Sequence, residues 1–133
     1  MSDSVFTKDA GRFLKLDETT ALKETYRRAK LALGLKEDEY TRSEFFGSDK
    51  IDQLLKQPGC VGIRVQYGKR WEDENGKATE ENKGQLKPRI FLTGVDARGK
   101  SLPVHTGPSG MKDDAGNDGE MAVGDGFTCP RHC

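Results

Sequence analysis

The chain has 133 residues, with 22 basic (Lys and Arg) and 22 acidic (Asp and Glu) side chains, so its formal net charge at pH 7 is zero. This balance excludes the strongly positive field that attracts many proteins to nucleic acids or anionic membranes, and we expect no nucleic-acid partner. Hydrophobic residues make up 33% of the chain and glycine occurs 16 times, which predicts one domain with a single core and extensive loops.

The sequence also bears on cellular location. No apolar run approaches the roughly 20 residues of a membrane-spanning helix. The N-terminal sequence MSDSVFTKDAGRF lacks the basic start and apolar stretch of a secretion signal. Three cysteines, an odd number, do not form the even framework typical of small secreted domains. The default prediction is a cytoplasmic protein without a membrane span, with export by another route left open.

The chain opens with an arm and a helix. Residues 1–15 scatter single apolar side chains among polar ones and predict a loosely ordered arm. From Asp17 the pattern becomes helical, with Asp17 as the expected N-cap and Gly34 as the expected terminator. The apolar positions that recur at helical spacing are Leu22, Tyr26, Ala29 and Leu33.

The densest apolar region is residues 45–67, where a short helix turns into a strand. Ser48 is the expected N-cap, and Ile51, Leu54 and Leu55 form one apolar stripe. Pro58 ends the helix because it lacks a backbone N–H. Apolar and polar residues then alternate over 61–67, which predicts a strand with one buried face.

Residues 69–87 are rich in charge and glycine and predict a mobile insert between two strands. Trp71 is its single large aromatic side chain. It either packs on the edge of the sheet or contacts a partner protein, since tryptophan is common at interface hot spots.

A second strand is predicted at 89–95, a tight turn at 96–100 and a third, shorter strand at 101–104. Pro103 places the third strand at an edge of the sheet, because proline cannot donate to a neighbouring strand. The predicted fold is α+β: a small antiparallel sheet of about three to four strands, two helices packed on one face, and an extended C-terminal tail.

The predicted organisation therefore has three parts. Residues 1–15 form the arm, residues 16–104 form the α+β core, and residues 105–133 form a Gly- and Asp-rich tail that ends in the sequence CPRHC.

This terminal sequence carries the most distinctive chemistry. Cys129, His132 and Cys133 are soft ligands that suit zinc, and Cys60 or His105 could complete a tetrahedral set. Against a zinc site, the cysteine spacing is C-x3-C rather than C-x2-C, and no second cysteine pair is present. The cofactor prediction is therefore none, with zinc as the alternative.

Thiol chemistry is another interpretation. Arg131 and His132 lie beside Cys133, and a neighbouring positive charge lowers a thiol pKa. Cys129 and Cys133 could close a small disulfide ring, or either could pair with Cys60 or with another chain. The C-x-x-C spacing of thioredoxin-like oxidoreductases is absent.

Three local sequences also carry a resemblance: PGCVGIR at 58–64, GVDARG at 94–99 and the closing CPRHC at 129–133. In these segments the chain resembles a group of small uncharacterised bacterial proteins that share a PGCxGIR segment, a GVDxxG hairpin and a C-terminal CPxxC motif. The similarity covers roughly residues 45–133. It implies a shared fold and a shared role for the tail, and it brings no activity or cofactor.

No nucleophile, phosphate loop or paired acid and base appears in the sequence, so no catalytic residue is predicted. The leading hypothesis is a non-enzymatic protein-interaction or self-assembly protein with a cysteine-bearing tail, whose partner is another protein or a second copy. Trp71 and Arg131 are the candidate interaction residues. The alternative is a metal-binding or thiol redox protein that uses Cys60, Cys129, His132 and Cys133.

Overall fold

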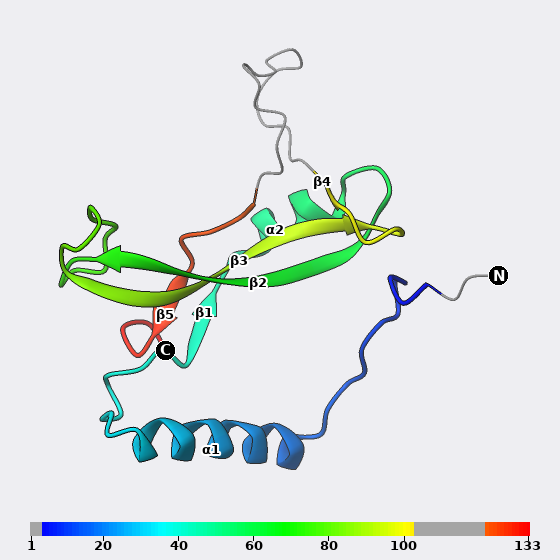
Figure 1. The fold of residues 1–133 in the computed structure, drawn as a ribbon. Coiled ribbons are helices and arrows are strands. Elements are labelled where there is room, and N and C mark those ends of the chain that lie inside the picture. The colour runs from blue at the N-terminus through cyan, green and yellow to red at the C-terminus, as the bar shows by residue number, and fades with distance from the viewer. Residues whose placement is uncertain (1–3, 103–121) are drawn as a thin grey trace.

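The computed structural model describes residues 4–102 and 122–133. Within them the chain is α+β, as predicted, with two helices and two antiparallel sheets (Figure 1). The elements, in chain order, are α1 Leu16–Ala32, β1 Ser43–Phe45, α2 Ser48–Leu55, β2 Cys60–Glu72, β3 Gln85–Asp96, β4 Ser101–Leu102 and β5 Phe127–Cys129.

The structure is built around a long hairpin, β2–β3, to which β4 adds a third strand. The two strands pair from Cys60 opposite Asp96 to Glu72 opposite Gln85. The predicted insert at 69–87 is therefore too long, because both strands continue into it and only 73–84 lie between them. The end of β2 was hidden because three of its last four residues, Lys69, Arg70 and Glu72, are charged. Of these, Glu72 is buried among ion pairs.

Helix α2 packs on this hairpin and contacts both β2 and β3. Leu54 is fully buried there. Gly94 permits the close approach, since a Cβ at that position would lie 3.2 Å from the backbone oxygen of Leu54 and 2.7 Å from Gln57 Oε1. The predicted apolar stripe is confirmed at Leu54, whereas the N-cap is Gly47 rather than Ser48.

The second sheet joins β1 to β5, with Ser43 opposite Cys129 and Phe45 opposite Phe127. The predicted extended tail, 105–133, therefore ends in a paired strand. Residues 105–121, with His105, lie outside the described residues, as do Pro103 and Val104 of the predicted third strand. The three-residue strands β1 and β5 are too short to show a period in the sequence.

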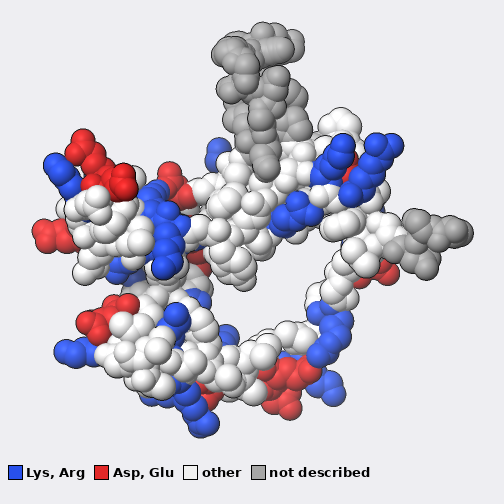
Figure 2. All heavy atoms as spheres, viewed as in Figure 1, with Lys and Arg blue, Asp and Glu red and all other residues white. Residues whose placement is uncertain are grey.

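Helix α1 differs most from the prediction, because it does not pack on the sheet beside α2. None of its residues is buried. The space-filling view in Figure 2 shows an open gap between α1 and the hairpin sheet. Its C-terminal half contacts the following loop instead, where the Tyr26 ring meets Tyr40 edge-on and the Tyr26 hydroxyl donates to Thr41 O at 3.0 Å. The apolar spacing predicted the helix correctly and its burial incorrectly.

The helix also begins earlier than expected. Asp17 is not its N-cap: the helix starts at Leu16, and the Lys15 backbone N–H donates to Glu18 Oε1 at 2.9 Å. Part of the predicted loose arm is placed as well. Ser4 Oγ donates to Ala97 O at 3.1 Å, and the Phe6 ring lies below the Arg64 guanidinium at 5.8 Å.

Candidate functional site

The predicted cysteine motif forms a closed ring. Cys129 and Cys133 are joined by a disulfide with 4.6 Å between their Cα atoms. Cys129 is buried in β5, while Cys133 is exposed and its Sγ lies 3.7 Å from Arg42 Nη2. The Cys129–Pro130 peptide is cis, and the His132 backbone N–H donates to Thr128 O at 2.6 Å. Among the pairings left open by the sequence, the structure has the ring within the tail.

Cys60 is not brought to this ring. It is the first residue of β2 and its thiol donates to Gly62 O at 3.3 Å. The tail instead contacts the far end of β2, beyond Glu72. A strand of 13 residues spans on the order of 40 Å, so Cys60 is separated from the other three predicted site residues.

Metal binding gains no support from this geometry. In residues 4–102 and 122–133, no group of three or more His, Cys, Asp and Glu side chains could hold a metal ion. Both tail sulfurs are in the disulfide, and a thiolate is the form that binds zinc.

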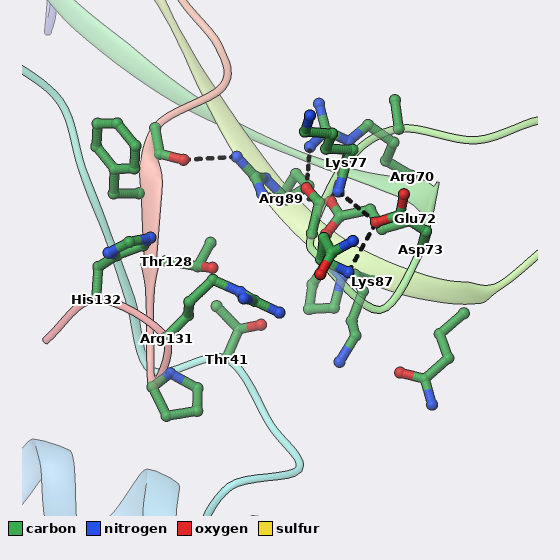
Figure 3. Close-up of a pocket in the computed structure, with 18 of the residues that line it drawn as sticks. Thr41, Arg70, Glu72, Asp73, Lys77, Lys87, Arg89, Thr128, Arg131 and His132 are labelled. Atoms are coloured by element: carbon green, nitrogen blue, oxygen red, sulfur yellow. Dashed lines mark hydrogen bonds and ion pairs between the residues drawn. The ribbon is translucent and has the colours of Figure 1, made fainter.

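Arg131 and His132 hold the ring in place. Arg131 extends from the tail toward the β2–β3 hairpin, as Figure 3 shows, and its Nη2 donates to Glu74 O at 2.6 Å. His132 meets the Phe127 ring edge-on, with 5.0 Å between ring centres. Arg131, a predicted interaction residue, therefore contacts the chain's own hairpin.

Trp71, the other predicted interaction residue, lies half-buried in β2 opposite Leu86. Its carbonyl accepts a hydrogen bond from the Thr79 N–H at 2.8 Å. The residue therefore belongs to the ordered end of the hairpin.

A charge network joins the two sheets; it is enclosed at Glu44, Glu72 and Arg89 and exposed at Asp125. Arg89 forms ion pairs with Glu44 at 2.9 Å and with Glu72 at 3.3 Å. Arg70 pairs with Glu72 at 3.0 Å and also with Asp125. Sequence reasoning missed these residues, because their charges are scattered over four segments that only the fold brings together.

The network forms one wall of a cleft of about 740 Å³ between the hairpin, the loop at 38–41 and the tail. The cleft is lined by cationic and acidic side chains in equal number: Arg70, Lys77, Lys87, Arg89 and Arg131, against Asp38, Glu72, Asp73, Glu74 and Asp125. Figure 3 shows ten of the lining residues by name. The formal charge of the lining is therefore balanced.

Asp73, at the rim of this cleft, has its pKa lowered chiefly by the Lys77 backbone N–H, which donates to its Oδ1 at 2.9 Å. The Asn75 N–H donates to the same atom at 2.8 Å. The carboxylate is therefore occupied in holding its own loop.

Within the described residues, the apolar stripe of α1 is only partly covered. Leu22 is 62% exposed and Leu33, which caps the helix, is 74% exposed. Ala29 is exposed between them, and Tyr26 is partly covered by Tyr40. Sequence reasoning found these residues and assigned them to the core.

Comparison with known proteins adds no relative: no protein-family model, no curated protein and no solved structure matches the chain. The resemblance to the group with the PGCxGIR and CPxxC segments therefore stays a prediction. No helix within the described ranges is long and apolar enough to cross a membrane.

Proposed function

We propose that this chain is a non-enzymatic assembly protein that pairs with a second copy of itself through α1. The single observation that carries the proposal is that a helix of 17 residues has none buried. Most of the stability of helices in proteins comes from packing an apolar face against other elements rather than from helical propensity. A second polypeptide would supply that packing.

The spacing of the stripe favours another helix as the covering element. Leu22, Tyr26, Ala29 and Leu33 follow one another at intervals of four, three and four residues. This interval pattern is the one by which two helices interlock their side chains. In an antiparallel pair of α1 helices, Leu22 would face Leu33 of the second copy, and Tyr26 would face the small Ala29.

A second copy is the simplest source of such a helix, because a two-fold interface uses the same patch on both subunits. The tail has a structural role in this proposal. Cys129 and Cys133 are joined to each other, so neither provides a thiol for a link between chains.

Size-exclusion chromatography with light scattering tests the proposal. We expect a dimer for the unmodified chain, with and without reductant, and a monomer for the double variant Leu22→Glu, Leu33→Glu. Thr20→Glu is the matched control, since Thr20 is exposed on the opposite side of α1 and its side chain forms no hydrogen bond with another described residue. Pairing through α1 would be refuted if the unmodified chain is a monomer at every protein concentration measured. It would also be refuted if the double variant still forms a dimer.

A further inference from the structure

The two outer edges of the hairpin sheet differ in how they are covered. The outer edge of β3 pairs with β4 at Gly94 and Val95, and Leu92 exchanges two backbone hydrogen bonds of 2.9 Å with Val123. Further along the same edge, the Ile90 N–H donates to Glu44 Oε1 at 3.1 Å. These contacts cover the outer edge of β3 from Ile90 to Val95.

The same contacts fix which backbone groups of β2 point outward. In an antiparallel pair, residues directly opposite each other direct their N–H and C=O groups either both inward or both outward. The backbone N–H groups of Leu92 and Ile90 point outward, so the backbone groups of their partners Val65 and Tyr67 also point outward. The carbonyl of Trp71 agrees with this alternation, because it accepts from Thr79 on that outer side.

Between Ile63 and Lys69, the part of the chain that the structure describes leaves this outer edge of β2 open. No described residue forms a strand pairing or backbone hydrogen bond with it. The side chains beside it are apolar and accessible: Val65 is 47% exposed and Tyr67 is 85% exposed. An open edge flanked by apolar side chains is a template for an added strand, and natural proteins usually cover or block such edges.

Charge indicates the kind of strand that would pair. From Cys60 to Trp71, β2 carries three cationic side chains and no acidic one. Arg70 is neutralised by Glu72 and Asp125, whereas Arg64 and Lys69 form no ion pair with any described residue. A second β2 would bring more positive charge to this edge, while an acidic strand would complement it.

We propose that the outer edge of β2 binds an extended, acidic segment of a partner protein as an additional strand. The added backbone would pair with the outward groups of Ile63, Val65, Tyr67 and Lys69. Its apolar side chains would lie on the face of Val65 and Tyr67, and its carboxylates would alternate to the face of Arg64. The charge of Lys69, on the first of these faces, would add to the attraction at longer range. This surface is separate from α1, so the inference does not depend on the proposed function.

The probe is a short synthetic peptide in which valine alternates with glutamate, labelled for fluorescence anisotropy. The matched probe carries lysine in place of glutamate. We expect the acidic peptide to bind, with an affinity that falls as salt is raised, and the lysine peptide to bind at least about tenfold more weakly. Equal binding of the two peptides, or no binding of either, overturns the proposal.

Tyr67→Pro tests the backbone edge directly. It removes an N–H that points away from β3, so the β2–β3 hydrogen bonds remain. Tyr67→Thr is the control, since it removes the aromatic ring and keeps the N–H. We expect about a tenfold or greater loss of affinity for the proline variant relative to the threonine variant, and a further loss with Lys69→Glu. Equal affinity of the two Tyr67 variants overturns the inference.

Hydrogen exchange gives a readout that needs no variant. In the free chain the amides of Val65 and Tyr67 should exchange faster than those of Arg64 and Gln66, and the acidic peptide should protect them. Protection in the free chain that depends on protein concentration would instead identify a second copy on this edge and overturn the acidic partner.

Discussion

Glu44 of β1 and Arg89 of β3 form an enclosed ion pair across the junction of the two sheets, with 2.9 Å between Oε2 and Nη2. Their side chains are only 2% and 13% exposed. Glu44 also accepts from the backbone N–H groups of Ile90 and Gly126, each at 3.1 Å. One carboxylate therefore connects β1, β3 and the segment that leads into β5.

Replacing Glu44 should destabilise the fold strongly. Glu44→Ala leaves Arg89 without one of its two carboxylates and two backbone N–H groups without acceptors, and breaking a buried pair costs about 3–5 kcal/mol. Urea denaturation measures the loss. Glu24→Ala is the control, because Glu24 pairs with Arg27 and Arg28 at the surface of α1, where such pairs contribute about 1 kcal/mol or less. Equal losses for the two variants would show that the Glu44 network is not structural.

The disulfide ring should contribute modestly to stability. Its cysteines are four residues apart, and closing so short a loop removes little entropy from the unfolded chain, about 2 kcal/mol. We expect a loss of that size for Cys129→Ser with Cys133→Ser, measured by urea denaturation without reductant. Cys60→Ser should leave the ring in place. Mass spectrometry of the whole chain would then show the Cys129–Cys133 disulfide as a gain of two hydrogen atoms on reduction. A double variant as stable as the unmodified chain would contradict this role.

The parts of the fold that the sequence predicted are those with a local signal. The stripe around Leu54 and the alternation over 61–67 each lie within one element. The alternation predicted the strand correctly and the burial of its apolar face incorrectly, since Val65 is 47% and Tyr67 is 85% exposed. The β1–β5 pairing has no such signal, because two three-residue strands far apart in the chain must meet first. The Glu44–Arg89 pair was missed for the same reason. For α1, the helical spacing of the apolar residues was recognised correctly, but the helix was wrongly expected to pack on the sheet. The spacing of Leu22 and Tyr26 shows that one face is apolar and does not show what covers that face.

Acid should destabilise the tight turn at 96–100. Backbone N–H groups of Lys100 and Arg98 donate to Asp96 Oδ1 at 3.0 and 2.8 Å, and the Lys100 bond is the main cause that lowers the pKa of Asp96. The pKa of Asp96 in the folded chain lies below the unfolded value of about 3.9. The stability that these hydrogen bonds contribute is therefore complete above about pH 3.9 and is lost as the pH falls through the folded pKa. Carboxyl carbon NMR measures the titration. A midpoint at or above 3.9 would contradict these hydrogen bonds, and Asp96→Asn should remove this part of the acid sensitivity.

Gly84, where the hairpin loop re-enters β3, should tolerate no side chain. Its φ is +89°, and a Cβ there would lie 2.1 Å from Glu72 O, which is backbone that β2 holds in place. Gly84→Ala must therefore both strain its own backbone and displace the end of β2, for a loss of about 2 kcal/mol or more. Gly124→Ala is the control, because no atom lies within 4 Å of a Cβ at that position and its φ is not positive. Urea midpoints compare the two variants. If they coincide, the hairpin end is free to rearrange, and the cleft wall formed by residues 73–78 is not rigidly placed against the tail.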